Sequence, residues 1–219
     1  MSNFKTSFLL LPLVCLLMGG CAVQPKANYA AFRADDPHSI LVVPVINDTV
    51  NVPAPDYLLT SISEPIAERG YYVFPVNLVR GVLDGSGLSD ANLLRSADPR
   101  RLGQMFGADA VLYVTLERWD SRYMVLETTT TVEIKYRLRD TRDGNTIWKN
   151  DEKIQYTPQA SGGGLAGLIA QAIVAAIQKA APDYMPLARQ ANEQAVDTVH
   201  VGLPAGPQDA AYRKDQDQF

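Results

Sequence analysis

A continuous run of apolar, largely β-branched residues at positions 39–46 constrains the fold more than any other stretch of this sequence. Its residues are Ser-Ile-Leu-Val-Val-Pro-Val-Ile. Such a run indicates a strand buried on both faces, because a strand with one wet face would alternate apolar and polar residues. A second apolar run, Tyr71–Phe74, follows after one helical segment. The sequence therefore predicts a strand–helix–strand unit whose two strands are parallel.

The segment between these two strands, residues 56–69, has the pattern of a helix that packs one face. Leu58, Ile62 and Ile66 recur at four-residue spacing, and Gly70 is suited to the position after the last turn. Pro65 conflicts with a continuous helix because it has no N–H to donate and its ring clashes with the preceding turn. We therefore expect Pro65 to kink this helix or divide it.

The following residues predict antiparallel strands. Asp98-Pro99 is typical of a helix start, with the helix ending at Gly107, and Asp143-Gly144-Asn145 is typical of a hairpin turn. The expected elements are a short helix at 75–83, a strand at 108–119, a long alternating strand at 122–138 with a bulge near 128–131, and a return strand at 146–156. The expected fold class is mixed α/β: a βαβ unit followed by antiparallel strands in one mixed sheet, with helices packed on it.

The alanine-rich segment 165–180 after Gly162–Gly164 is the most ambiguous element. Its apolar stripe fits a helix that packs in the core, a helix at a subunit or partner interface, or a membrane-inserted helix. The candidate interface residues are Leu165, Leu168, Ile169 and Ile173. A second helical stretch, 183–199, is expected to be interrupted at Pro186. Residues 201–219 are rich in Pro, Gly, Asp and Gln, which predicts a disordered tail.

The N-terminus has the pattern of a leader peptide that ends in a lipidation site. Lys5 precedes an unbroken apolar run, Phe8–Met18, which at 11 residues is too short to span a bilayer of ~20 residues. Gly19-Gly20-Cys21 completes a lipobox, with Met18 where Leu is usual. Cys21 would then carry diacylglycerol on its sulfur and an acyl chain such as palmitate on its amine. The alternative is an ordinary secretory signal followed by a chance cysteine.

Cleavage before Cys21 divides the chain into a leader, a tether and a domain. We expect a signal peptide at 1–20, a tether at 21–37, one domain at 38–200 that includes the helical segment 165–199, and the tail at 201–219. The leader carries one lysine and no acid, so the formal charge of −4 becomes −5 on its removal. This mild acidity gives no electrostatic footprint for nucleic acid. With Cys15 in the leader and Cys21 acylated, the folded part has no disulfide and no cysteine-based metal site.

No combination of residues in this sequence indicates catalysis. His38 and His200 have no partners at triad or ligand spacing, and the carboxylate pairs have ordinary structural explanations, such as Asp140 and Asp143 beside a turn. The other pairs considered are Glu64 with Glu68 and Glu117 with Asp120. The glycine-rich stretches lack the Lys and Ser/Thr of a phosphate-binding loop, and a nucleophile elbow is absent. The sequence therefore predicts no enzyme, no cofactor and no metal.

Several motifs are informative when they are taken together. They are Ile40–Pro44 with Asn47; Leu58-Leu59, Pro65, Ala67-Glu68 and Gly70–Val76; Phe106–Tyr113; and Asp140, Gly144 and Trp148. In combination they resemble the proteobacterial lipoprotein family first catalogued as a genome-derived neisserial antigen. The resemblance covers roughly residues 21–185, and the motifs are specific only in combination.

This resemblance implies a periplasm-facing α/β domain similar to the N-terminal domain of TolB, with a tendency to form dimers. It also implies neighbouring genes for a curli-secretion-channel-like lipoprotein and another small lipoprotein. The family has no established activity and supplies no catalytic residues. Cys21 carries over as the acylated position. By resemblance to other Gram-negative lipoproteins, Ala22 in place of Asp favours the outer membrane, with surface exposure left open.

The expected function is that of an outer-membrane-anchored, periplasmic, non-catalytic accessory or structural subunit of an envelope transport or assembly complex. The alternative is a periplasmic binding module for a small molecule or glycan, with a cleft near Asn47, Pro75 and Asn77 at the strand ends. A hydrolase with an unrecognised site is a third hypothesis. A deep pocket with converging polar groups would favour ligand binding, and an exposed apolar surface would favour assembly.

Overall fold

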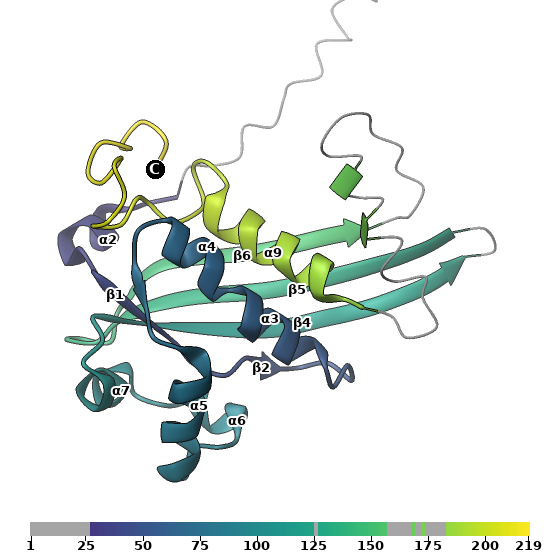
Figure 1. Cartoon of the computed structure of the whole chain (residues 1–219), viewed down its shortest axis with the longest axis horizontal. Coiled ribbons are helices and arrows are strands. Elements are labelled where there is room, and N and C mark those ends of the chain that lie inside the picture. Colours follow the sequence, from purple (N-terminus) through teal and green to yellow (C-terminus); the bar gives the residue numbers. More distant parts are fainter. Residues whose placement is uncertain (1–26, 125–126, 157–167, 170–171, 174–182) are drawn as a thin grey trace, which may run out of the picture.

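One mixed sheet organises the molecule (Figure 1). The computed structural model describes residues 27–124, 127–156, 168–169, 172–173 and 183–219. The strand order is β3-β1-β4-β5-β6, and β2 also pairs with β4. The strands are β1 (Ser39–Val42), β2 (Ile46–Asn47), β3 (Tyr72–Val73), β4 (Ala110–Met124), β5 (Glu127–Asp140) and β6 (Thr146–Tyr156). The helices are α2 (Ala30–Asp35), α3 (Ala54–Ser61), α4 (Ser63–Glu68), α5 (Val76–Gly85), α6 (Ala91–Leu94), α7 (Pro99–Phe106) and α9 (Met185–Asp197).

The predicted fold class is confirmed, including the parallel strand–helix–strand unit. β1 pairs in parallel with both β3 and β4, whereas β4–β5 and β5–β6 are antiparallel. The single strand expected at 39–46 is divided into β1 and β2 around Pro44, which cannot donate to a ladder. Val42 lies opposite Leu112 and Ile46 opposite Thr115, so the divided strand uses four steps where β4 uses three. One extra residue is thus accommodated at the break.

Pro65 divides the predicted helix, as expected. α3 ends at Ser61, and α4 begins at Ser63 with Pro65 in its first turn. In a continuous helix the N–H at position 65 would donate to the carbonyl of Ser61, and proline has no such N–H. The break therefore falls before the proline, where the first turn of a new helix needs no donor from that position.

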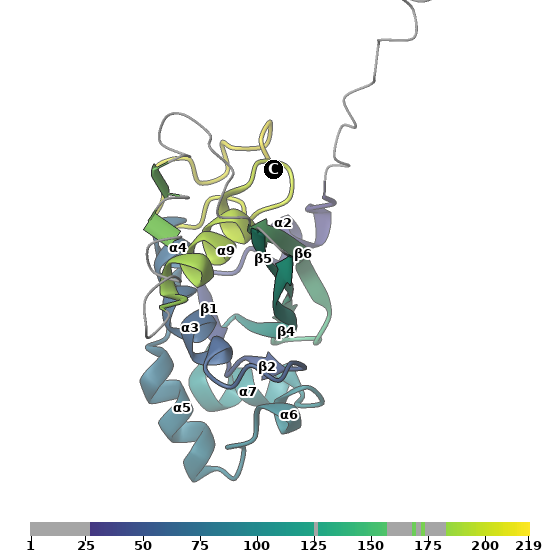
Figure 2. The same cartoon turned by 90° about the vertical axis from the view of Figure 1, so that its right-hand side faces the viewer.

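Two hydrophobic cores lie on opposite faces of the sheet because successive residues of a strand point to opposite sides. Ile40 and Val42 face the larger core beneath α3, α4 and α9, whereas Leu41 and Val43 face a smaller core that includes buried residues of α5, α6 and α7. Figure 2 shows α3, α4 and α9 on one side of β4, β5 and β6. The apolar run at 39–46 is continuous because the side chains of β1 are buried on both faces of the sheet.

The prediction of one long strand at 122–138 is wrong, because this stretch contains a hairpin. Met124 of β4 pairs with Glu127 of β5, so the chain reverses between them. No Gly, Pro, Asn or Asp marks this reversal, and the residues around it are the apolar Met124-Val125-Leu126, so the sequence lacks a turn signal there. The expected bulge near 128–131 is not found; the register shifts lie in β4, between Leu116 and Arg118, and in β6, opposite Leu138 and Arg139. The alternation predicted for this stretch is present in β5, whose buried apolar side chains are Val132, Ile134, Tyr136 and Leu138.

The other phase of β5 is polar, and its charges pair across the sheet. Glu133 accepts ion pairs from Lys153 of β6 at 2.8 Å and from Arg118 of β4 at 3.5 Å. Lys135 pairs with Glu117 in the same way. Such exposed pairs contribute little stability, about 0–1 kcal/mol each, but they keep this face of the strands hydrated.

A fully buried polar network joins the sheet to two helices. The side-chain amide of Asn192 in α9 donates to the Leu58 carbonyl at 3.0 Å and to the Ser61 hydroxyl at 2.8 Å. Its oxygen accepts from the Tyr136 hydroxyl at 2.8 Å. Asn192 and Tyr136 are both 0% exposed, and burial raises the pKa of Tyr136 well above its usual value. The network fixes the register of α9 because buried polar groups must be partnered.

The C-terminal residues differ from their prediction. Pro186 lies in the first turn of α9, where proline is tolerated, so this helix is not interrupted. Residues 201–219, predicted to be disordered, are ordered against the domain with Leu203, Ala205 and Phe219 buried. Their main chain pairs with the end of α4: Gly206 N–H donates to the Arg69 carbonyl at 2.6 Å, and Gln208 N–H donates to the Gly70 carbonyl at 3.0 Å. Hydrophobic periodicity does not detect a segment held by such non-local bonds.

We predict that Asn192→Ala lowers the free energy of unfolding by about 2–4 kcal/mol, because it leaves the buried Tyr136 hydroxyl and its other partners unsatisfied. The control Gln194→Ala changes an exposed residue of the same helix and should stay within about 0.5 kcal/mol. Urea denaturation of both variants measures the difference. Equal stability of the two would contradict a structural role for the network.

We predict that replacing two glycines by alanine changes the stability of the domain in opposite directions. Gly70 has φ +84°, and an added Cβ would lie 2.4 Å from the Asp209 nitrogen, so Gly70→Ala should destabilise by about 2 kcal/mol or more. Gly81 lies within α5 with nothing within 4 Å of its added Cβ, so Gly81→Ala should stabilise by about 0.5–1 kcal/mol. Thermal unfolding of both variants tests this pair, and a harmless Gly70→Ala would argue against the docked position of residue 209.

Candidate functional site

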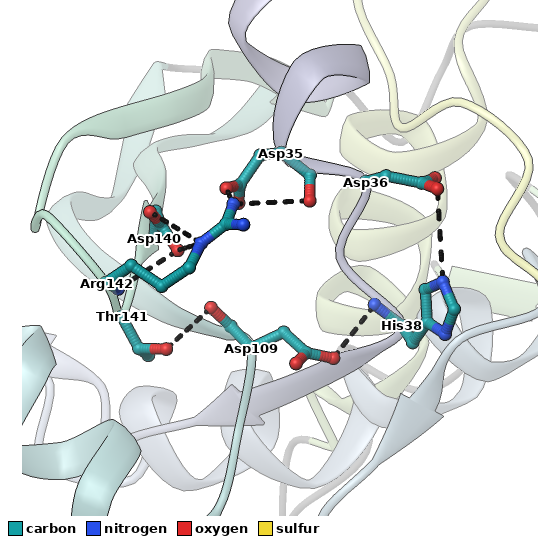
Figure 3. A pocket seen from close by; sticks show the side chains of 7 residues that line it. All are labelled: Asp35, Asp36, His38, Asp109, Asp140, Thr141 and Arg142. Carbon is teal, nitrogen blue, oxygen red and sulfur yellow. Dashed lines mark hydrogen bonds and ion pairs between the residues drawn. The ribbon is translucent and has the colours of Figure 1, made fainter.

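A polar cavity of about 270 Å³ opens where β1 and β4 begin and β5 ends (Figure 3). It lies at the amino ends of the parallel strands, because β1 and β4 start at Ser39 and Ala110. Four acids, one histidine, one arginine and one threonine line it: Asp35, Asp36, His38, Asp109, Asp140, Thr141 and Arg142. This gathering of polar groups makes it the candidate site that must be tested for chemistry.

Asp109 organises one wall of the cavity. Its Oδ2 accepts three hydrogen bonds, from the N–H groups of His38 at 3.0 Å and Ser39 at 2.9 Å and from the Ser39 hydroxyl at 2.8 Å. The Ser39 hydroxyl in turn accepts from the Asp109 N–H at 3.0 Å. Thr141 closes the same corner, donating its N–H to the Asp109 carbonyl at 3.0 Å. Asp109 therefore fixes how the chain enters β1 beside β4.

Arg142 joins the opposite wall to α2. Its Nε lies 3.2 Å from Oδ1 of Asp140, and its N–H donates to the same oxygen at 3.1 Å. The far end of the guanidinium pairs with the Asp35 carboxylate and donates to the Asp35 carbonyl at 3.3 Å. Figure 3 shows Arg142 between these two acids. Asp140 is only 4% exposed, so Arg142 supplies the charge that its burial demands.

Asp36 binds two residues near the C-terminus that are distant from it in sequence. It caps α2 in the left-handed conformation, at φ +50°, and its carboxylate accepts from the Tyr212 hydroxyl and from Arg213. Burial opposes its ionisation, but these two hydrogen bonds and the Arg213 charge outweigh that effect and lower the pKa of Asp36. His38 Nε2 lies 3.9 Å from the same carboxylate. These contacts favour the ionised form of the Asp36 carboxylate, which accepts the hydrogen bonds.

The cavity gathers residue types that occur in active sites, but the contacts seen here join structural elements. Each of these four carboxylates accepts from a named donor through at least one oxygen, while Oδ2 of Asp35 is buried without a hydrogen-bond partner among the described residues. The ion pairs of Arg142 tie α2 to the end of β5, and the hydrogen bonds of Asp109 tie the start of β1 to the start of β4. Across the described residues, no three His, Cys, Asp or Glu side chains come together in a group able to hold a metal ion. The geometry supports a structural clamp.

The predicted site residues lie elsewhere. Cys21 and Leu165 fall outside the described residues. Leu168 and Ile169 are 62% and 52% exposed, whereas Ile173 is 1% exposed and packs in the main core of its own chain. Ile173 is therefore unavailable for contact between chains, and the predicted interface is reduced to Leu168 and Ile169 among the described residues. In the described part of the chain, no helix combines the length and apolarity that crossing a bilayer would require.

The predicted cleft at the strand carboxyl ends is not supported at Asn47. Its amide donates to the Asn51 carbonyl at 3.0 Å, and its oxygen accepts from the N–H and hydroxyl of Thr49. These bonds hold a loop and leave no group directed at a ligand. Pro75 and Asn77 are exposed at the start of α5. Sequence reasoning missed the polar cavity because its residues come from three separate segments, 35–38, 109 and 140–142. Asp109 directly before one strand and Asp140 at the end of its partner were a usable signal.

Comparison with known proteins gives a consistent family assignment. The family model described as "Putative lipoprotein GNA1162-like" matches residues 27–208. The putative lipoprotein NMB1124/NMB1162 of Neisseria meningitidis serogroup B is 36% identical over 170 residues, which is 77% of this chain and 79% of that protein. The crystal structure of lipoprotein GNA1162 from Neisseria meningitidis matches with a TM-score of 0.56 and 38% identity, covering 64% of this chain and 98% of that one. The chain therefore belongs to the family of GNA1162-like putative lipoproteins.

Proposed function

We propose that this protein is an outer-membrane-anchored, periplasm-facing lipoprotein that acts as a non-catalytic accessory subunit of an envelope transport or assembly complex. The observation that carries the proposal is the lipobox at Cys21, which lies six residues before the described domain begins at Ala27. Membership of a lipoprotein family supports the same reading of that cysteine. Two or more acyl chains on Cys21 would give stable anchoring.

The polar cavity supports a role in binding or assembly over one in catalysis. Each of its carboxylates takes part, through at least one oxygen, in an ion pair or hydrogen bond that joins structural elements. An accessory subunit needs a stable domain held at a surface, and it needs no reactive group. The described residues form such a domain. Charged side chains pair across one face of β4, β5 and β6, and the buried apolar residues pack in two cores.

A homodimer is the second part of the proposal. Leu168 and Ile169 present apolar side chains to solvent beside the buried Ile173. Exposed apolar residues that are contiguous on a helix are suited to contact a second copy. The partners proposed from the family resemblance are a curli-secretion-channel-like lipoprotein and another small lipoprotein.

We predict that Cys21→Ser moves the protein from the membrane fraction to the soluble fraction, because it removes the acylated atom. The matched control is Cys15→Ser, which changes a cysteine within the leader and should leave the protein on the membrane. Fractionation with mass spectrometry of the mature N-terminus measures both. An unmodified N-terminus in soluble wild-type protein would overturn the anchoring proposal.

We predict that Ile169→Glu converts the detergent-solubilised dimer to a monomer, because a charge buried without a partner at an interface is costly. The control is Val199→Glu, which changes a residue that is 47% exposed. Sedimentation velocity of the full chain distinguishes the two states. A wild-type protein that sediments as a monomer would count against the dimer.

A further inference from the structure

The C-terminal residues lie across the first residues of the described domain. We call residues 27–36 the tether exit and residues 200–219 the tail segment. Figures 1 and 2 both show the tail segment beside α2, where the chain leaves toward its N-terminus. The tether exit directly follows the anchor proposed at Cys21, so contacts between these two segments bear on how the domain is held.

Main-chain groups join the two segments at both ends of the tether exit. Ala27 N–H donates to the His200 carbonyl at 2.8 Å, and the Tyr29 hydroxyl donates to the Gly202 carbonyl at 2.8 Å. Arg33 donates to the main-chain oxygen of Phe219. The tail segment therefore contacts the tether exit through residues from its start and from its end.

Aromatic packing reinforces these bonds. The rings of Tyr29 and Phe219 meet edge to face at 5.9 Å, and they are 3% and 1% exposed. The Arg69 guanidinium lies over the Phe219 ring, 4.6 Å from its centroid. Edge-to-face aromatic pairs and cation–π contacts both stabilise a buried ring, so Phe219 is the main apolar anchor of the tail segment on the tether exit.

The tail segment is itself fixed to the body of the domain. Tyr71 donates to the Pro204 carbonyl at 2.7 Å, Arg69 to the Leu203 carbonyl at 2.6 Å and Trp148 Nε1 to the Gly202 carbonyl at 3.0 Å. The tail segment thus bridges the tether exit and the sheet.

The tail segment supplies most of the hydrogen bonds that the tether exit makes to the rest of the domain in the described residues. Phe32 is the only buried residue of α2, which has six residues, and isolated helices of that length are unstable in water. The other contacts of the tether exit are the packing of α2 on β6, the Phe32–Tyr71 ring pair at 6.3 Å and the pairing of Asp35 with Arg142. Tyr29, Arg33 and Asp36 all depend on the tail segment for the partners named above.

We propose that the tail segment is a clasp that keeps the tether exit docked and so limits how far the domain can stand from the membrane. The proposal rests on acylation of Cys21. Cys21 precedes Ala27 by six residues, which span at most about 20 Å. If the tether exit were released up to β1, the free chain from Cys21 to Ser39 would have eighteen residues and reach about 60 Å. Release of the clasp would therefore increase the maximum distance between Cys21 and the docked part of the domain roughly threefold.

The test compares a clasp variant with a matched control in lipidated protein bound to vesicles. The variant Phe219→Ala with Arg213→Ala removes the aromatic anchor and one partner of Asp36. The control, Lys214→Ala, changes an exposed residue whose ammonium bonds only within the tail segment, to the Ala210 carbonyl. Hydrogen exchange at the amides of 29–36 should be at least tenfold faster in the variant and unchanged in the control. Amides of β4 and β5 report whether the domain stays folded.

Reach is measured separately by energy transfer to labelled lipid. Lys149→Cys places a dye beside the tether exit, because Lys149 lines a cavity together with Ala27 and Asn28. The mature chain has no other free thiol if Cys21 is acylated. Transfer should fall in the clasp variant and persist in the control.

The outcomes separate the two proposals. Wild-type exchange rates at 29–36 in the variant, or unchanged energy transfer, would overturn the clasp. Failure of the wild-type protein to float with vesicles would overturn the anchor, while exchange in the soluble protein would still test the clasp contacts. If the double variant unfolds, Tyr212→Phe removes only the hydroxyl bond to Asp36 and should raise exchange in the same amides to a smaller extent.

Discussion

The rest of the structure depends on the pairing of β4 on both of its edges. This strand pairs in parallel with β1 and β2 and antiparallel with β5, so its main-chain groups are satisfied on two sides. Its alternate side chains enter the two cores: Leu112 and Val114 lie in the larger core, and Val111 and Tyr113 lie in the smaller core. The bulge after Leu116 marks the point beyond which β4 no longer pairs with β2.

Buried polar groups show where tertiary structure imposes specificity. Asn192, Asp140 and Asp215 are all less than 10% exposed, and each has partners from a segment far away or a neighbouring turn. Asp215, for example, accepts from Ala205 N–H at 2.6 Å and lies 3.5 Å from Arg69. Burial of such groups costs free energy unless they are paired. The arrangement of helices and tail that pairs all of them is therefore favoured over others. The domain uses its charges to hold segments together, which fits a protein whose proposed role is to be held at a surface.

Local signals predicted much of the fold because they act within a few residues. Asp98 caps α7 by accepting from Arg100 N–H at 2.9 Å, and Asp143 supports the hairpin turn by accepting from Asn145 N–H at 2.8 Å. The division of the helix at Pro65 follows from a missing donor. The candidate site was not predicted, because Asp35, Asp109 and Arg142 come together only when α2, β4 and β5 have their final positions.

The sequence by itself determined the double-sided burial of β1, the βαβ unit, the alternation within β5 and the position of the proposed acylated cysteine, since each depends on residue type and short-range spacing. Only the tertiary structure decided the reversal after Met124, the burial of Ile173 and the docking of residues 201–219. Those features depend on bonds between residues far apart in the chain, such as Tyr29 to Gly202. Composition and periodicity carry no record of such pairings, because a proline- and glycine-rich segment can be ordered by donors that the rest of the fold supplies.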